Sequence, residues 1–179
     1  MKVRLVRASR SDYAKIKQLY RKAFPPEEQA PFWLLRWKAH QRIVDFWSVY
    51  ADVHWAGLLY IVNDNDLSYI FYFAVSEEIR GKGIGSAALQ TAVQKYTGRR
   101  LFLAIEEIDK AASNYAERVR RKAFYERNGF VKQPGRLQEA QDMSEVLGVG
   151  GRVRPEEYKH LMQTYMGFRA KFIKFEMTE

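Results

Sequence analysis

The segment from Ala74 to Leu89 reads AVSEEIRGKGIGSAAL and decides the fold prediction. It starts at the end of an apolar run typical of a buried strand and ends in the small apolar residues of a helix. Between them, alternate glycines leave room for backbone N–H groups to converge on an anion, and the following helix directs its positive dipole end to the same point. Arg80 and Lys82 add positive charge. The glycines are Gly81, Gly83 and Gly85. We therefore predict a diphosphate-binding loop between a strand and a helix.

Three other interpretations of this loop fit less well. A plain turn needs neither the three glycines nor the two cations. A P-loop requires GxxxxGK[ST], which the sequence does not contain. Residues 83–88 do fit the dinucleotide pattern GxGxxA, and Glu106 lies near the distance expected of a ribose-binding acid. However, residues 76–82 separate Val75 from Gly83, and antiparallel strands precede the unit, whereas dinucleotide glycines follow the first strand directly.

Alternation and helical spacing predict the remaining elements. Strands are expected at Val3 to Ala8, Val44 to Ala51, Ala56 to Val62, Leu67 to Val75, Leu101 to Ile105, Met143 to Val149 and Arg169 to Glu176. Helices are expected after Ser9, Ser11 and Asp12 up to Pro25, from Phe32 toward Gln41, and at Ile84 to Tyr96, Ala116 to Asn128 and Pro155 to Tyr165. The three strands before the loop suit an antiparallel meander, and the strand, helix, strand unit around it suits parallel pairing. We predict an α/β (α+β) fold with a mixed, mostly antiparallel sheet.

Length and composition limit the class of protein. The 179 residues, of 21.1 kDa, suit a single domain spanning 1–179. The absence of cysteine excludes a disulfide framework, a thiolate metal site and a cysteine nucleophile. The first residues lack the apolar stretch of a signal peptide, and no window reaches the length of a membrane helix. We expect a cytoplasmic protein with no membrane partner.

The net charge of +9 indicates an anionic ligand or partner. One basic run, from Arg118 to Lys122, would on a helix normally form a solvated face, although a nucleic-acid stripe or an anionic-ligand site would have the same composition. The three histidines, His40, His54 and His160, lack the spacing of a metal site. We therefore expect no metal.

Two motifs resemble the GNAT superfamily of N-acetyltransferases. Residues 80–85, RGKGIG, match its [RQ]xxGx[GA] signature, and Phe73 to Val75 stand where its cofactor-binding strand ends. Residues 123–130, AFYERNGF, resemble the family's FYxxxGF helix end. With the order of elements, the resemblance covers roughly Val3 to Val131. It implies a GNAT-like sheet splayed at its middle strands, helices on both faces, and acetyl-CoA as cosubstrate.

The resemblance also implies the cofactor contacts. The pantetheine arm would lie along the free edge of the strand Leu67 to Val75, with Phe73 and Val75 hydrogen-bonding it and the Val75 N–H polarising the thioester carbonyl. Relatives often carry an asparagine where this chain has Arg118, and Asn114 is the candidate substitute. The expected cofactor-binding residues are Phe73, Ala74, Val75, Arg80, Gly81, Lys82, Gly83, Ile84, Gly85, Ser86 and Asn114.

Without cysteine, the simplest mechanism is direct attack of an amine on bound acetyl-CoA. By resemblance Tyr125 is the general acid for the departing thiolate, and packing of its ring in the core is the alternative. For the base we predict Glu106, at the end of a strand, with an exposed carboxylate and deprotonation through water as the alternative. Glu107, Glu27 and Glu28 are less favoured.

The acceptor is expected to carry an amine, on a small molecule, a peptide or a protein. Its pocket would involve the first two helices and residues 135–167. Aromatic candidates for the pocket lining are Trp33, Trp37, Phe46, Trp47 and Tyr165. The second function compatible with the charge is a basic RNA- or ribosome-associated module that binds acyl-CoA without turnover. Nucleic acid is the less favoured partner, and a homodimer is left open.

Overall fold

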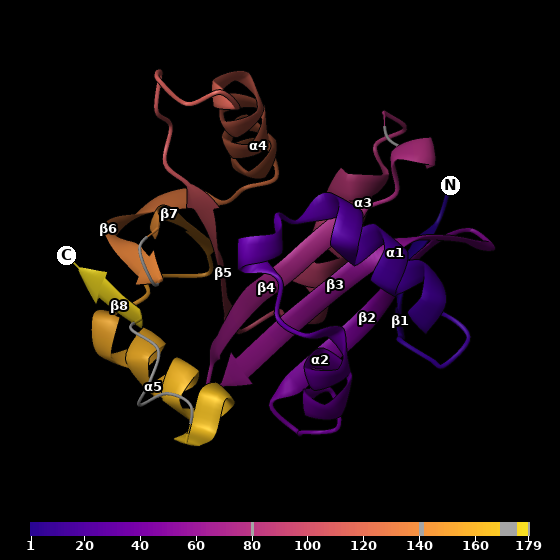
Figure 1. Cartoon of the computed structure of the whole chain (residues 1–179), viewed down its shortest axis with the longest axis horizontal. Helices are drawn as coiled ribbons and strands as arrows, with labels where there is room; N and C mark the ends of the chain where they lie inside the picture. Colours follow the sequence, from indigo (N-terminus) through magenta and orange to yellow (C-terminus); the bar gives the residue numbers. More distant parts are fainter. Residues whose placement is uncertain (80, 140–141, 169–174, 179) are drawn as a thin grey trace. The chain divides into compact units, whose positions relative to one another are not determined.

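The computed structural model describes residues 1–79, 81–139, 142–168 and 175–178. It divides into two compact units, drawn in Figure 1. The first contains Met1–Val62 and Ile70–Lys95, and the second contains Asn63–Tyr69 and Tyr96–Glu179. The expectation of a single domain stays a prediction.

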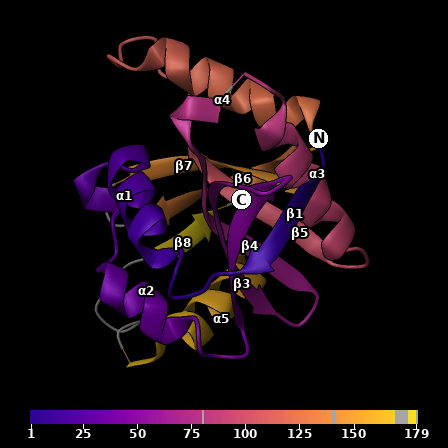
Figure 2. The ribbon, with the colours of Figure 1, turned by 90° about the vertical axis from the view of Figure 1, so that its right-hand side faces the viewer.

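The first unit is a sheet with helices on both faces. Its strands are β1 (Val3–Arg7), β2 (Val44–Ala51), most of β3 (His54–Asp64) and the larger part of β4 (Leu67–Val75). Its helices are α1 (Tyr13–Ala23), α2 (Phe32–Lys38) and α3 (Ile84–Lys95), with single 3₁₀ turns η1 (Pro26–Glu28) and η2 (Glu77–Ile79). β1 and β3 each pair antiparallel with β2, and β4 lies beside β3. Figure 2 shows α1 and α2 on one side of these strands and α3 on the other.

The start of α1 differs from its expected capping chemistry. Asp12 occupies the N-cap position, but its side chain makes no capping hydrogen bond to the helix. Its buried carboxylate instead accepts hydrogen bonds from the Ser48 hydroxyl at 3.0 Å and the Tyr50 hydroxyl at 2.6 Å, both on β2. The Ser9 backbone N–H also donates to it, at 3.2 Å. These hydrogen bonds from Ser48 and Tyr50 to Asp12 therefore connect the start of α1 to β2.

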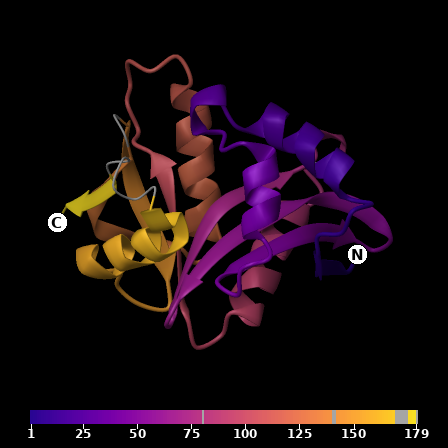
Figure 3. The same cartoon turned by 60° about the horizontal axis from the view of Figure 1, so that its bottom comes forward.

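The second unit is built from β4's first residues and the C-terminal half of the chain. Its elements are β5 (Arg100–Glu106), α4 (Tyr115–Arg127), β6 (Val131–Glu139), β7 (Asp142–Val149), α5 (Pro155–Met166) and β8 (Phe175–Thr178). The strand order is β4-β5-β7-β6-β8, with the pairs β5·β7, β7·β6 and β6·β8 all antiparallel. α4 and α5 lie on opposite sides of these strands (Figures 1 and 2). Figure 3 shows α5, in yellow-orange, beside β8.

The predicted parallel pairing is confirmed between Leu67–Tyr69 of β4 and Arg100–Phe102 of β5. Across the described residues the strands form one open, mostly antiparallel sheet of eight strands, so the predicted fold class is confirmed. No helix in the described part of the chain is long and apolar enough to cross a membrane.

Two strands near the C-terminus differ from the sequence prediction. β6 was not predicted, because Pro134 and Gly135 interrupt its pattern; the structure accommodates them where the β6–β7 register shifts, between Lys132 and Arg136. Of the closing strand predicted at Arg169 to Glu176, only Phe175 and Glu176 lie within the described residues. Both belong to β8, which extends to Thr178, and residues 169–174 lie outside the described residues.

Candidate active site

The last residues of β4 have the alternating exposure expected of a strand with one accessible face. Phe73 and Val75 are half-buried, and Ala74 between them is buried. The Ser76 N–H directly after the strand donates to the Ala56 carbonyl of β3 at 2.8 Å. Phe73 and Val75, which are predicted to hydrogen-bond the pantetheine arm, therefore lie with Ala74 at the end of β4, immediately before η2 and the loop.

Two glycines of the predicted loop have a backbone conformation that favours glycine. Gly81 and Gly83 have φ angles of +83° and +73°, in the region that disfavours side chains, and a Cβ at either would have no atom within 4 Å. Both glycines and Lys82 between them are exposed. Arg80 lies outside the described residues.

α3 begins directly after this loop. It runs from Ile84, which is buried, and Gly85 and Ser86 complete its first turn at intermediate exposure. The Ala87 N–H donates to the Gly83 carbonyl at 2.9 Å, so the helical hydrogen bonds begin at Gly83. The N–H groups of a first helical turn point out of the helix, and the dipole favours negative charge there. The described part of the predicted loop thus presents backbone donors, one lysine and a helix N-terminus together.

Glu106, the predicted base, ends β5 and is held by α4. Its Oε1 lies 2.9 Å from an Arg118 guanidinium nitrogen, and its Oε2 accepts from Arg121 at 2.9 Å. The Asn114 side-chain amide approaches the same carboxylate at 3.3 Å. The Glu106 side chain is 29% exposed. The carboxylate therefore sits in a polar cluster with solvent access.

Asn114 is the N-cap residue of α4, and its side chain is engaged at both ends. Its amide nitrogen faces Glu106, and its oxygen accepts from the Arg118 Nε at 2.7 Å. Arg118 also donates to the Glu107 carbonyl at 2.8 Å. Any contact from Asn114 to a cofactor would have to coexist with these bonds or replace them.

Three of the four cations in the basic run on α4 are partly buried, and only Arg120 is exposed as a solvated face would be. Arg118 and Arg121 bind Glu106, and the Lys122 ammonium lies 2.6 Å from the Glu145 carboxylate on β7. Burial alone would raise the pKa of Glu145, but hydrogen bonds from Lys122 and Lys132 bring it below its ordinary value. The run attaches α4 to β5 and β7, which a pattern of charges without their partners does not reveal.

Tyr125, the predicted acid, is buried in the last part of α4. Its ring contacts Phe124 at a centroid distance of 5.1 Å and Phe130 at 5.9 Å. Burial raises its pKa to about 12, although the nearby Arg121 charge opposes this. The phenol is therefore protonated at any ordinary working pH. Gly129, with φ of +86°, ends the helix as predicted.

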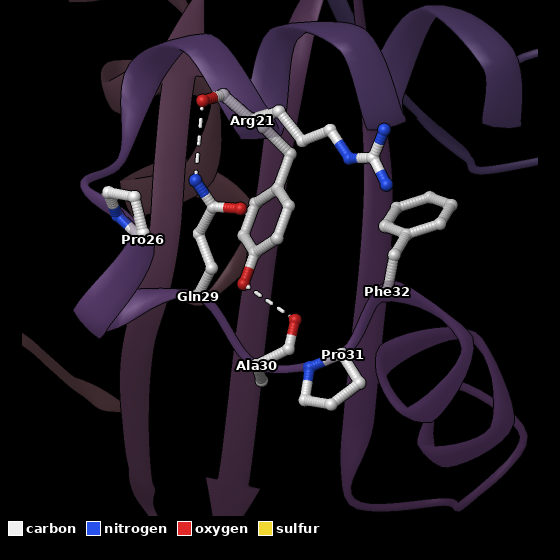
Figure 4. A pocket seen from close by; sticks show the side chains of 7 residues that line it. Arg21, Pro26, Gln29, Ala30, Pro31 and Phe32 are labelled. Atoms are coloured by element: carbon white, nitrogen blue, oxygen red, sulfur yellow. Dashed lines mark hydrogen bonds between the residues drawn. The ribbon is translucent and has the colours of Figure 1, made fainter.

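A cavity of about 220 Å³ lies between α1 and α2 in the first unit (Figure 4). It is lined by Tyr20, Arg21, Pro26, Gln29, Ala30, Pro31 and Phe32. Gln29 Nε2 donates to the Phe24 carbonyl at 2.7 Å and the Tyr20 hydroxyl to the Ala30 carbonyl at 3.1 Å, which fixes the loop. Figure 4 shows the Arg21 side chain extending toward the Phe32 ring.

β4 supports the loop that forms this cavity. The Tyr72 hydroxyl donates to the Glu28 carbonyl at 2.8 Å and accepts from the Ala30 N–H at 3.4 Å. Tyr72 directly precedes Phe73, so the strand that is predicted to bind the cofactor also holds the loop that lines the cavity. None of the predicted aromatic lining residues belongs to this cavity. Trp33 and Trp37 are 63% and 60% exposed, whereas Phe46, Trp47 and Tyr165 are buried.

The sequence pattern of the family described as acetyltransferase (GNAT) matches residues 13–130, more than half of the chain. The chain belongs to the GNAT family. The resemblance predicted from the two motifs is therefore confirmed. No curated protein matches the chain.

Solved structures give the same fold for this GNAT protein. One, from Bacteroides thetaiotaomicron and described as a GNAT-family acetyltransferase, matches with a TM-score of 0.74 at 20% identity, covering 92% of this chain and 97% of the other. The ribosomal-protein-S18-alanine N-acetyltransferase of Escherichia coli matches with 0.62 at 15% identity, covering 86% and 97%. A ribosomal L7/L12 alpha-N-protein acetyltransferase, solved in complex with coenzyme A, matches with 0.60 at 20% identity, covering 83% and 93%.

Proposed function

We propose that this GNAT protein transfers the acetyl group of acetyl-CoA to a primary amine by direct attack in a ternary complex. The observation that carries the proposal is the loop at the start of α3. There, Gly81 and Gly83 adopt positive φ angles with open space above them, within the region that matches the family. The N-terminus of a twelve-residue helix with such a loop suits a diphosphate.

The residues at this loop fit coenzyme A as a ligand. We propose that backbone N–H groups of residues 81–86 bind its diphosphate, with charge support from Lys82 and from Arg80. Phe73 and Val75 would hydrogen-bond the pantetheine arm as an added strand, and Ala74 would form the floor beneath it. The solved neighbour in complex with coenzyme A supports this assignment by fold alone.

The chemistry that we propose requires one bond made and one broken. The amine nitrogen attacks the thioester carbon, the C–S bond breaks, and the Val75 N–H stabilises the oxyanion that forms between these events. Tyr125 gives its phenolic proton to the departing sulfur. Its pKa of about 12 keeps the phenol protonated before this step, and the same shift makes it a weaker acid than an exposed tyrosine. The products are an N-acetylated acceptor and coenzyme A.

Glu106 is the proposed acceptor of the amine's proton. A carboxylate has about four lone-pair positions. Arg118, Arg121 and Asn114 supply three donors, which leaves one position for the substrate amine. Proton loss directly to water is the alternative, in which Glu106 serves only to attach α4.

For the acceptor, we propose that a side chain next to the reacting amine enters the cavity between α1 and α2. Most of the exposed lining of this cavity is polar, and Arg21 among its lining residues suits an acceptor that carries a carboxylate. Two neighbours are named as N-acetyltransferases of ribosomal proteins, so peptides beginning with a small residue belong in the first panel of acceptors. An Arg21→Ala variant is expected to raise KM for the preferred acceptor while leaving KM for acetyl-CoA unchanged.

The experiment is thiol release from acetyl-CoA with a panel of small amines, amino acids and peptides. Turnover with one acceptor class and its loss in Tyr125→Phe is the expected result. Binding of acetyl-CoA with no release from any acceptor would contradict the proposal and favour a binding module.

A further inference from the structure

Gly57 of β3 lies against the last peptide unit of β4. A Cβ built at Gly57 would lie 2.2 Å from the Ala74 carbonyl oxygen and 3.2 Å from its carbonyl carbon. Carbon and oxygen at such positions overlap, so no residue other than glycine fits without movement of backbone. The carbonyl oxygen of Ala74 is thus much closer to this Cβ position than the carbonyl carbon is. Because the C=O bond is only about 1.23 Å long, the carbonyl must point largely at Gly57.

The direction of this carbonyl determines the direction of an amide. Ala74 C=O and Val75 N–H belong to one trans peptide unit, in which the two groups point in opposite directions. Since the carbonyl points toward β3, the Val75 N–H points away from β3. This is the amide to which the proposed reaction assigns the oxyanion.

β3 is itself irregular at this position. In the pairing with β2, Val49 is opposite Gly57 and Tyr50 is opposite Trp55, so Ala56 is an extra residue in β3. The carbonyl of Ala56 accepts the Ser76 N–H at 2.8 Å. A bulge in β3 and a glycine next to it thus hold both peptide units that follow Ala74.

We infer that Gly57 is a positioning residue for the proposed acetyl transfer: its missing side chain lets the Ala74 carbonyl turn toward β3 and so aims the Val75 N–H at the thioester. The inference rests on the proposed function, and it assigns a role to a residue outside both family motifs. Gly57 acts through the backbone of β4 and touches no substrate.

The test compares Gly57→Ala with Gly148→Ala, a matched glycine of β7. A Cβ at Gly148 would meet its nearest atom, the Gln133 side-chain nitrogen, at 3.2 Å, and neither glycine has a positive φ. Gly57→Ala is expected to lower kcat at least about tenfold while KM for acetyl-CoA changes less than about threefold, because one oxyanion donor is misdirected and the diphosphate loop is intact. Gly148→Ala is expected to keep kcat within about twofold. A kcat of Gly57→Ala within about twofold of the wild type would overturn the inference.

Amide chemical shifts give a second readout that does not need turnover. Without ligand, Gly57→Ala is expected to shift the Val75 and Ser76 amides more than those of α3, while the thermal unfolding transition stays cooperative. Unchanged Val75 and Ser76 shifts, or a variant that does not fold at 25 °C, would contradict a local positioning role. If the wild type turns over no amine, the proposed function fails by itself, and these shifts still decide whether Gly57 orients the peptide.

Discussion

The Arg121 guanidinium on α4 donates to the Glu106 carboxylate at the end of β5 at 2.9 Å. Arg118, one turn earlier, binds the other oxygen at the same distance. A carboxylate held by two guanidinium groups can serve as a structural anchor, as a proton acceptor or as both. The two roles predict different kinetics.

Glu106→Gln is the variant that separates them. If Glu106 takes the amine's proton, as proposed, the variant lowers kcat about a hundredfold. The glutamine amide has the same shape as the carboxylate that it replaces. The melting temperature of the variant therefore shows how far the loss of charge weakens the attachment of α4. Full activity with a lowered melting temperature would assign Glu106 to the anchoring of α4 alone.

Tyr125→Phe removes only the phenolic oxygen. The ring contacts with Phe124 and Phe130 remain, so we expect a stability change below about 1 kcal/mol. kcat is expected to fall by about a hundredfold or more, with the Kd for coenzyme A unchanged in calorimetry. If the wild type and Tyr125→Phe have the same kcat, Tyr125 is a packing residue and not the general acid.

The sequence predicted a glycine-rich loop followed by a helix, and both are present in the structure. The side-chain contacts that the sequence did not predict have physical reasons. The loop and the helix after it follow from local backbone requirements, which Gly81 and Gly83 meet by themselves. The roles of Arg118, Arg121 and Lys122 depend on carboxylates of β5 and β7 that are distant in the sequence. A lone glycine within a strand pattern, Gly57, was the available signal for a close backbone approach.

Gly83→Ala tests the loop against a matched glycine. Gly83 and Gly98 have φ angles of +73° and +84°, and a Cβ at either would have no atom within 4 Å. Alanine at each is expected to cost about 1 kcal/mol of stability from backbone strain. Only Gly83→Ala is expected to weaken coenzyme A binding, by about tenfold in a calorimetric titration. If Gly83→Ala and Gly98→Ala bind coenzyme A with the same Kd, the diphosphate does not bind at the loop that contains Gly83.

The lowered pKa of Asp12 makes the free energy of unfolding depend on pH. Burial alone raises its pKa, but hydrogen bonds from Tyr50, Ser9 and Ser48 bring it below the ordinary value. A lowered pKa in the folded state adds stability above the unfolded value of about 3.9, and this stability is lost as pH falls through the folded pKa. Asp12→Asn is expected to cost about 2 kcal/mol at pH 7 in urea unfolding. The difference in the free energy of unfolding between the wild type and Asp12→Asn should become smaller below about pH 4. A difference that does not depend on pH would contradict a charged Asp12 in the folded protein.

The decisive measurement for acetyl transfer is thiol release from acetyl-CoA by the wild type and by Tyr125→Phe, with a panel of amines and peptides as acceptors. We expect saturable release with at least one amine class, an acetylated product detected by mass, and a rate reduced about a hundredfold in the variant. Tight binding of RNA that weakens steeply with salt, together with no thiol release from any acceptor, would contradict it.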